Sequence, residues 1–425
     1  MKTKLLIFGI TGDLGTHRLL PALEKIIKTG DFDDLSIIGI SRHGAETTAL
    51  LARIKEPEIL NNKLTMFQMD LDNIDDYHKL CDFISLTNDE QLIIDLAVPP
   101  NTILQIIDFL GKSGLNSSNV KILFEKPFGI DFASAENIIK QTAKYYDETQ
   151  VYRIDHYLAK EMSQNIIAFR GKNALFSSVW NNNFIEMIEI IVSEEIGIDG
   201  RVNLYEQTGA LRDVVQGHIM QLLALTLMDI PHNFDWNSLP GFRLDALNQI
   251  KPADPQTVSR AQYEGYKQEV NNHESMVETF VSLELVSDHI NWLGVPIKLI
   301  TGKSLSEKTT EIRIKFKQIF EAQSNCLVFH IQPDEGIEIG LFVKKPGYDN
   351  EFETQKLSFH YPSNVMLPDA YEQVIVDAIL SNKSLFTSSQ EVLQSWRILK
   401  PIQDHWTRLS ESPKTYPIGS NIFEI

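Results

Sequence analysis

Cysteine is scarce in this chain, which has only Cys81 and Cys326 among 425 residues. Two cysteines cannot build the disulfide framework of a small secreted protein. The simplest interpretation is a reducing compartment, and we expect a cytoplasmic protein. No apolar run is long enough to cross a bilayer, so we expect no membrane partner.

Basic residues are also in the minority, with 39 lysines and arginines against 57 aspartates and glutamates and a formal net charge of -18. This charge argues against a surface that binds nucleic acid or an anionic membrane. The overall negative charge would repel an anionic substrate, so binding of such a substrate would require a local basic pocket. We expect no metal site.

The chain is long enough for two domains, since 425 residues exceed one ordinary hydrophobic core. Residues 1–155 alternate strand-like and helical segments. Apolar runs predict strands at 5–8, 36–40, 66–69, 92–98 and 121–124, and helices at 14–28 and 130–146, the latter with Asp131 as N-cap. This alternation predicts a Rossmann-type α/β domain with a doubly wound parallel sheet.

The pattern changes after about residue 160. We predict a helix at 209–228 and strands at 184–192, 277–281, 298–300, 311–316, 327–331 and 340–343, followed by helices at 369–381 and 388–399. Several of these strands alternate polar and apolar residues, as in an antiparallel sheet with one covered face. We therefore expect a larger α+β domain over 156–425, with a mainly antiparallel sheet.

A glycine-rich turn, Gly9-Ile10-Thr11-Gly12-Asp13-Leu14-Gly15, follows the first strand and opens a helix. Glycines let the backbone approach a pyrophosphate, and the helix N-terminus supplies N–H donors. The spacing is GxxGxxG and not the common GxGxxG, so a simple tight corner is the alternative. Its position between a strand and a helix favours a dinucleotide site.

The second strand ends in Ser41 and Arg42, where an NAD site usually has an acidic residue. A serine and an arginine favour a ribose 2′-phosphate, and we predict a preference for NADP over NAD. A solvated loop arginine is the alternative.

Lys126 follows the fifth strand, in the run Glu125-Lys126-Pro127-Phe128-Gly129. Ligands of doubly wound sheets bind at the carboxyl ends of the strands. We expect Lys126 to lie between a cofactor and the molecule that is oxidised. The alternative is a salt bridge with Glu125 at the strand end.

The run Arg153-Ile154-Asp155-His156-Tyr157-Leu158-Ala159-Lys160-Glu161 gathers an acid, an imidazole, a phenol and an ammonium. Such a cluster can hold a phosphorylated substrate and orient a base. His218 lies on the apolar face of the helix at 209–228. A histidine on such a face is more often a hydrogen-bonded core residue than a catalytic one, and this is the alternative. The carboxylates of Asp155 and Asp213 favour a general base, because a buried imidazole bonded to a carboxylate works near neutral pH.

These motifs together resemble the glucose-6-phosphate dehydrogenase family over nearly the whole chain. The matching runs include GITGDLG, AVPP, EKPFG, RIDHYLAKE, GALRDVVQGH, QLLALTLMDIP, WLGVPIKLITGK and DAYEQVIVDAI. RIDHYLAKE and ALRDVVQGH are specific to that family.

The resemblance implies a role for each matching residue. His218 is the base that takes the proton of the sugar C1 hydroxyl, and Asp155 orients it. The sugar phosphate is held by Lys126, His156, Tyr157, Lys160, Glu194, Asp213, Lys303 and Lys308. The cofactor is lined by Gly9, Thr11, Gly12, Asp13, Leu14, Ser41, Arg42 and Lys126. The family forms its dimer through the sheet of the second domain, so we expect a homodimer or homotetramer.

Several positions depart from the family pattern. Gly15-Thr16-His17-Arg18 replaces an alanine followed by basic residues, so some phosphate contacts are expected to be lost. Ala159 replaces a glycine, Gly217 replaces the asparagine before the base, and the run 291–300 lacks two arginines. None of these changes removes a proposed catalytic group.

The sequence therefore predicts an NADP-dependent oxidation of D-glucose 6-phosphate to 6-phosphoglucono-1,5-lactone, with NAD as an alternative acceptor. This reaction opens the oxidative pentose phosphate pathway. A dehydrogenase of another phosphorylated sugar is the first alternative. The second is a non-catalytic paralogue that binds a sugar phosphate or a nucleotide.

Overall fold

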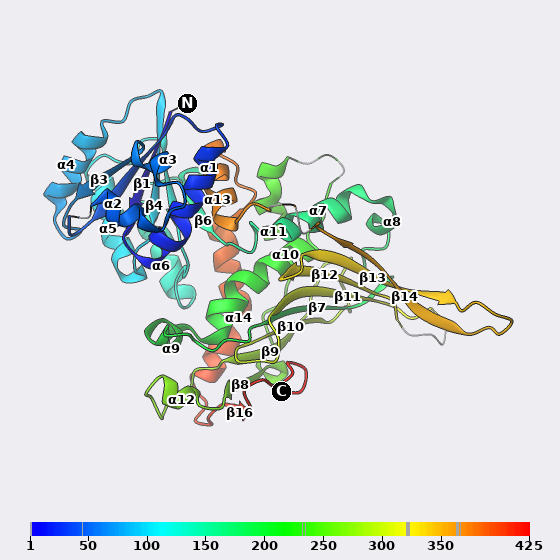
Figure 1. Ribbon diagram of the computed structural model, residues 1–425. Coiled ribbons are helices and arrows are strands. Elements are labelled where there is room, and N and C mark those ends of the chain that lie inside the picture. The colour runs from blue at the N-terminus through cyan, green and yellow to red at the C-terminus, as the bar shows by residue number, and fades with distance from the viewer. Residues whose placement is uncertain are drawn as a thin grey trace.

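The computed structural model describes residues 2–425 except 45, 232, 234, 320–323, 363, 364 and 366. Its strands form two sheets, connected and covered by helices (Figure 1). The first sheet is mainly parallel and the second mainly antiparallel, which confirms the predicted fold class. Within the described residues, no helix is both long enough and apolar enough to cross a membrane.

The first sheet has seven strands in the order β15-β6-β5-β4-β1-β2-β3. Neighbouring strands are parallel except for β15 and β6. The bounds are β1 Lys2–Phe8, β2 Leu35–Ser41, β3 Leu64–Gln68, β4 Glu90–Leu96, β5 Val120–Phe124, β6 Val151–Ile154 and β15 Phe386–Thr387. The central strands are almost wholly apolar because helices cover both faces of the sheet.

The helices of this region divide between the two faces. Apolar side chains of α1 and α13 pack on one face, and those of α4, α5, α6 and the start of α14 pack on the other. The bounds are η1 Gly15–Leu19, α1 Leu20–Lys28, α2 Thr47–Leu50, η2 Leu51–Arg53, α3 Pro57–Asn61, α4 Ile74–Ile84, α5 Pro100–Lys112, α6 Phe132–Thr142, η3 Glu148–Gln150, α13 Ala370–Leu380 and α14 Ser389–Trp406. Asp131 caps α6 as predicted, since its carboxylate accepts from Ser134 N at 2.8 Å.

The second sheet has nine strands in the order β14-β13-β12-β11-β7-β10-β9-β8-β16. Only the pairs β7–β10 and β8–β16 are parallel among the strands that the structure describes. The bounds are β7 Ile185–Ser193, β8 Ser259–Tyr263, β9 Phe280–Leu285, β10 Ile297–Gly302, β11 Thr309–Phe316, β12 Cys326–Gln332, β13 Gly336–Lys344, β14 Phe352–His360 and β16 Lys414–Tyr416.

Most helices of this region pack on one face of the sheet and enclose the main core. Tyr205 of α9 and Tyr266 of α12 instead join a smaller apolar cluster on the other face. The bounds are α7 Glu161–Lys172, α8 Ala174–Ser177, α9 Val202–Ala210, η4 Leu211–Ile219, α10 Met220–Leu227, η5 Trp236–Ser238, α11 Leu239–Asn248, η6 Pro255–Thr257 and α12 Tyr266–Glu269. The segments η4 and α10 run on continuously and confirm the helix predicted at 209–228. Gly209, with φ at 63°, separates this helix from α9.

Three sequence expectations differ from the structure. The helix predicted to end at 399 continues to Trp406 through Pro401, because packing of its apolar face outweighs the hydrogen bond that proline removes. Strand β9 begins at Phe280 and not at 277. Strand β14 was not predicted, since its exposed residues lack an alternating apolar pattern.

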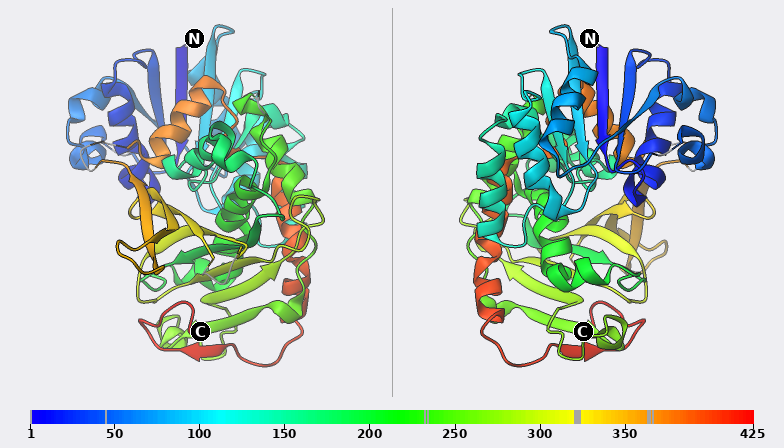
Figure 2. Two further views of the ribbon diagram at one scale, coloured as in Figure 1. Left: turned by 90° about the vertical axis from the view of Figure 1, so that its right-hand side faces the viewer. Right: turned by 90° about the vertical axis from the view of Figure 1, so that its left-hand side faces the viewer.

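The C-terminal third returns to the first sheet before it ends on the second. Strand β15 pairs with β6, and α14 runs from the first sheet along the second (Figure 2). The proposed division into 1–155 and 156–425 stays a prediction. Helix α13 and strand β15 lie beyond residue 155 in the sequence but pack with the first region.

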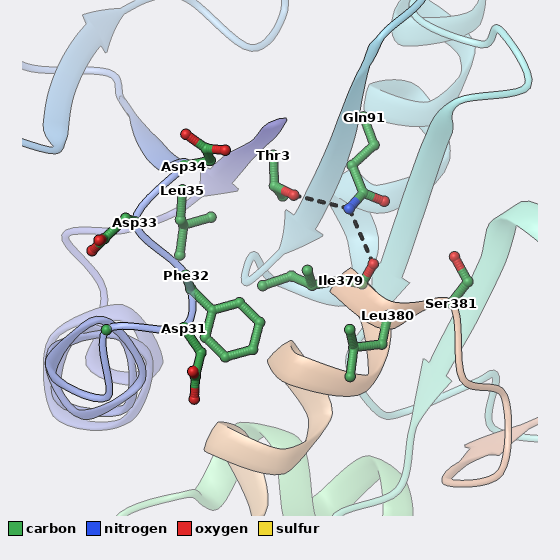
Figure 3. A pocket seen from close by; sticks show the side chains of 11 residues that line it. Thr3, Asp31, Phe32, Asp33, Asp34, Leu35, Gln91, Ile379, Leu380 and Ser381 are labelled. Atoms are coloured by element: carbon green, nitrogen blue, oxygen red, sulfur yellow. Dashed lines mark hydrogen bonds between the residues drawn. The ribbon is translucent and has the colours of Figure 1, made fainter. Parts of the chain in front are cut away.

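A cavity of about 560 Å³ lies at the amino ends of the first sheet's strands (Figure 3). Its lining includes Thr3, Asp31, Phe32 and Gln91, and Gln91 Nε2 donates to Thr3 Oγ1 at 2.9 Å. Doubly wound sheets bind ligands at the opposite, carboxyl ends of their strands. We therefore expect the functional site at that opposite edge.

Candidate active site

The predicted catalytic residues meet at the carboxyl edge of the first sheet. Lys126 follows β5, and Asp155 follows the adjacent parallel strand β6. The helix η4 comes from the second region and brings His218 to the same place. Residues far apart in the sequence thus form one cluster where the two regions join.

His218 and Asp155 form a buried pair. Nδ1 of His218 lies 2.8 Å from Oδ1 of Asp155, and the same oxygen accepts from Tyr157 N at 2.9 Å. Asp155 is 1% exposed and His218 is 8% exposed. An ionised carboxylate accepts only, so His218 Nδ1 carries the proton and Nε2 keeps the lone pair that a general base needs.

The Asp155 carboxylate is ionised in spite of its burial. Burial alone would raise the pKa of Asp155, but its interactions with His218 and Lys126, including the hydrogen bond from His218, outweigh it. The resulting pKa lies well below the usual range for aspartate. Asp155 can therefore orient the His218 ring and stabilise its protonated form.

Lys126 lies on the opposite side of the imidazole. Its Nζ is 3.2 Å from His218 Nε2 and 3.2 Å from the backbone oxygen of Asp213. Burial lowers the pKa of Lys126, and the carboxylates of Asp155 and Asp213 act against that shift. The hydrogen-bond partners of Lys126 Nζ lie on the helix that carries His218, and not at Glu125, the partner that the alternative interpretation proposed.

Two further buried carboxyls are Glu125, beside Lys126, and Asp95, which interacts with Glu125. Burial raises the pKa of Asp95 to about 7, and burial together with Asp95 raises the pKa of Glu125 well above its usual value. Each has a side-chain oxygen without a hydrogen-bond partner. Glu125 is therefore protonated at neutral pH and does not compensate the ammonium of Lys126.

Two rings border the imidazole. The ring centroids of His156 and Tyr157 lie 4.4 Å and 4.2 Å from that of His218. Burial and the His218 charge hold the pKa of His156 well below its usual value, and burial raises the pKa of Tyr157. Both rings are therefore neutral, and His156 can donate one N–H to an anion.

A cavity of about 520 Å³ opens beside these rings. It is lined by Arg18, His156, Tyr157, Lys160, Glu194, Glu195, Ile196, Arg201, Lys308, Gln332, Asp369, Ala370 and Tyr371. The predicted phosphate residues His156, Tyr157 and Lys160 thus share one cavity with Glu194 and Lys308. Four basic side chains, those of Arg18, Lys160, Arg201 and Lys308, outnumber the carboxylates of Glu194, Glu195 and Asp369 in this lining. The cavity therefore carries a small excess of positive charge in an acidic chain, as an anionic substrate requires.

Three predicted substrate residues lie outside this lining, namely Lys126, Lys303 and Asp213. Lys303 is 2% exposed and forms an ion pair with the cavity residue Glu194. Asp213 lies on η4, next to the catalytic cluster, where its backbone oxygen accepts from Lys126. Their roles toward a substrate stay predictions.

Sequence reasoning missed Arg18 and Arg201 as cavity residues. Arg18 lies in η1, in the segment where lost cofactor contacts were expected, and it faces the second region. Arg201 caps α9, and Gln332 ends β12. No local pattern could reveal these residues, because the cavity forms only where the two regions meet.

A separate cavity of about 250 Å³ lies over the glycine-rich turn. Its lining includes the predicted residues Gly9, Thr11, Gly12, Ser41 and Arg42, together with Ile40, Leu71, Asp72, Ala97, Val98, Pro99 and Thr102. The predicted cofactor residues Asp13, Leu14 and Lys126 lie outside it. Asp13 Oδ1 pairs with His17 Nδ1 at 2.9 Å, and Leu14 packs on the core of the first sheet.

The glycine-rich turn fits a dinucleotide. Gly9 has φ at 76°, and a Cβ there would lie 2.2 Å from the Ala97 backbone oxygen. At Gly12 a Cβ would contact only the Gly9 oxygen, at 3.1 Å, so this part of the turn faces open space. A phosphate can therefore approach the backbone at the start of the helix.

Comparison with known proteins agrees with this geometry. Residues 6–165 match the family model for the glucose-6-phosphate dehydrogenase NAD binding domain, and residues 167–422 match the model for the C-terminal domain. The chain belongs to the glucose-6-phosphate dehydrogenase family. The match of the first region also shows a nicotinamide cofactor site there.

Individual family members are similar along almost their whole length. The glucose-6-phosphate 1-dehydrogenase of Chlamydia muridarum is 33% identical, over 98% of this chain and 92% of the relative. That of Chlamydia pneumoniae is 34% identical with the same coverage. A solved glucose-6-phosphate dehydrogenase in complex with glucose 6-phosphate is 28% identical, covers 99% of this chain and 95% of that chain, and has a TM-score of 0.92.

Proposed function

We propose that this protein oxidises D-glucose 6-phosphate to 6-phosphoglucono-1,5-lactone with NADP as the acceptor, the entry reaction of the oxidative pentose phosphate pathway. The observation that carries the proposal is the buried His218–Asp155 pair beside a cationic cavity. Family membership supports the same conclusion, since the relatives are named glucose-6-phosphate 1-dehydrogenase. The solved relative in complex with glucose 6-phosphate has the same fold.

His218 is the general base of the proposed reaction. Its Nε2 takes the proton of the C1 hydroxyl while Asp155 holds Nδ1–H and stabilises the imidazolium that forms. The nicotinamide, when bound, supplies the acceptor for the hydride from C1. Lys126 lies beside Nε2 and is placed to contact the C1 oxygen as the base acts.

The cationic cavity holds the 6-phosphate. Lys160 is the N-cap of α7, so the positive end of that helix lies at the cavity wall with the ammonium group. His156, Tyr157, Arg18 and Arg201 add N–H and O–H donors. Phosphate binding positions C1 against His218, so free glucose is expected to be a poor substrate.

Arg42 supports NADP as the preferred cofactor. Its guanidinium lies exposed at the end of the cofactor cavity, next to the buried Ser41. Arginine binds phosphate through several N–H groups, and a ribose 2′-phosphate is present in NADP alone.

Arg42→Ala should weaken NADP binding roughly 10- to 100-fold and change NAD binding by less than about twofold. Titration of cofactor binding by calorimetry measures both, with Arg397→Ala, outside the cavity lining, as the matched control.

We propose a homodimer or homotetramer, located in the cytoplasm. Exposed apolar side chains on the β13–β14 hairpin support an interface between copies, and both free cysteines suit a reducing compartment.

One assay tests the proposed reaction. Absorbance of the reduced nicotinamide is followed with glucose 6-phosphate and each cofactor in turn, at saturating cofactor, across a panel of other phosphorylated sugars. Turnover with glucose 6-phosphate above every other sugar supports the proposal. Faster turnover of another sugar phosphate would instead establish the first alternative. Ligand binding without any turnover would establish a non-catalytic paralogue.

A further inference from the structure

Gly217, the residue before His218 on η4, packs against the end of the Lys126 side chain. A Cβ at this position would lie 1.9 Å from Lys126 Nζ and 2.5 Å from Lys126 Cε. These distances are far below van der Waals contact. Any residue other than glycine must therefore displace the ammonium of Lys126 from its place on the helix.

Space, and not backbone conformation, explains this requirement. Gly217 lies within η4 and does not have the positive φ of Gly209, which lies near the end of α9. An alanine at 217 can adopt the same backbone angles without strain. Because Gly217 has no side chain, a slot remains beside it. The atoms nearest to a Cβ at this position belong to the end of the Lys126 side chain.

The slot determines where the Lys126 ammonium lies. Within it, Nζ is 3.2 Å from both the Asp213 backbone oxygen and His218 Nε2. Asp155 holds the other ring nitrogen at 2.8 Å. The imidazole is therefore bordered by an anion at Nδ1 and a cation at Nε2.

We propose that Gly217 is a positioning residue that seats Lys126 against His218. The seated ammonium opposes a positive charge on the imidazole and covers Nε2 until the substrate hydroxyl takes its place. Displacement of the ammonium by the substrate hydroxyl rests on the proposed function, whereas the effect on ring protonation does not.

The charges around the ring give the direction of this effect. Among the described residues that border His218, Asp155 after β6 favours the imidazolium, and Lys126 after β5 opposes it. The rings of His156 and Tyr157, also after β6, are neutral. Asp213 is on the same helix as the base and faces Lys126. Removing the ammonium therefore leaves Asp155 unopposed and makes protonation of the ring easier.

The family resemblance implies an asparagine at position 217, and its Cβ would occupy the volume that Lys126 fills here. Gly217→Asn restores the family residue and serves as a second variant beside Gly217→Ala.

Proton titration of the His218 ring tests the proposal without substrate or cofactor. Nuclear magnetic resonance of protein with labelled histidine rings follows the His218 signal, assigned by its loss in His218→Asn. In Gly217→Ala and Gly217→Asn, the pH of half-protonation should rise by about one unit, because a cation a few ångströms away is displaced. Gly241→Ala, on α11 where a Cβ meets nothing within 4 Å, should leave it unchanged.

A double variant separates seating of Lys126 from other effects of the new side chain. Lys126→Met removes the ammonium and should itself raise the half-protonation pH. Adding Gly217→Ala to Lys126→Met should then cause no further rise. An unchanged titration in Gly217→Ala, or an equal rise in the Lys126→Met background, would overturn the proposal.

Activity gives an independent readout if the proposed reaction is present. The acidic limb of kcat/KM for glucose 6-phosphate should move to higher pH by the same amount in Gly217→Ala. Absence of turnover in the unmodified protein would refute the proposed function alone. The ring titration would still decide the role of Gly217.

Discussion

The imidazole of His218 has a different neighbour at each nitrogen, and this asymmetry explains its proposed chemistry. Asp155 fixes the proton on Nδ1, and Lys126 lies at Nε2. The sequence suggested the pairing with Asp155 from residue types and family resemblance. It gave no sign of the contact with Lys126, because that contact depends on the absence of a side chain at Gly217.

Replacement of the base tests this assignment. His218→Asn should lower kcat by roughly 10²–10⁴-fold, the usual contribution of a general base, with a modest change in KM for glucose 6-phosphate. Initial rates at saturating cofactor measure both constants. A kcat close to that of the unmodified protein would remove His218 from the mechanism.

Arg18 is the second prediction at the scale of single residues. It lines the substrate cavity although it belongs to the helix of the cofactor domain. Loss of a charged hydrogen bond to phosphate costs about 1.5–3 kcal/mol, so Arg18→Ala should raise KM for glucose 6-phosphate roughly 10- to 100-fold. His17→Ala, which changes the neighbouring exposed side chain outside that cavity, is the control and should leave this KM nearly unchanged.

Among the structural elements, η4 is the one whose direction depends most on the local backbone at its start. Gly209 ends α9 with φ at 63°, and a Cβ there would lie 2.5 Å from Glu278 Oε1. The same carboxylate accepts from Leu211 N at 2.9 Å, at the start of η4. The break and the cap together fix the direction in which the following helix presents His218.

The start of α14 depends on a fully buried ion pair. Arg243 on α11 donates from Nε to Glu391 at 2.7 Å and from its terminal nitrogens to the backbone oxygens of Ser384 and Phe386. Both side chains are 0% exposed. The pair therefore holds β15, which contains Phe386, on the edge of the first sheet.

Breaking this pair should strongly destabilise the protein. Glu391→Ala leaves a buried guanidinium without its carboxylate, and such a loss costs about 3–5 kcal/mol of the free energy of unfolding. Denaturant unfolding followed by circular dichroism measures the loss. Glu136→Ala breaks an exposed pair with Lys140 on α6 and should cost less than about 0.5 kcal/mol. Similar costs for both variants would contradict the structural role of the buried pair.

At the scale of the whole molecule, two sheets are joined so that one edge of the first faces the helices of the second. This junction forms the substrate cavity and gathers basic side chains in a chain with a net charge of -18. The second sheet also extends into the β13–β14 hairpin, which projects from the body of the molecule (Figure 1). Exposed apolar residues on the hairpin are Leu341, Val343, Phe352, Leu357 and Phe359.

These apolar residues predict an interface between copies of the chain. Light scattering after size exclusion should give at least twice the monomer mass of 48.4 kDa. A variant with both Leu357→Asp and Phe359→Asp should shift the protein toward monomer. Leu380→Asp, at an exposed leucine of α13 outside the second sheet, should not. A monomeric unmodified protein would refute the proposed assembly.

The sequence by itself determined the fold class and the order of most elements, and it suggested His218 and Asp155 as a general base and its carboxylate. Local patterns suffice for the fold class and the elements, because burial on two faces produces apolar runs and turns require particular residues. The tertiary structure alone decided that Arg18 and Arg201 line one cavity and that the end of Lys126 fills the space beside Gly217. Such contacts join segments distant in the chain, and the space between packed elements leaves no periodic pattern in the sequence.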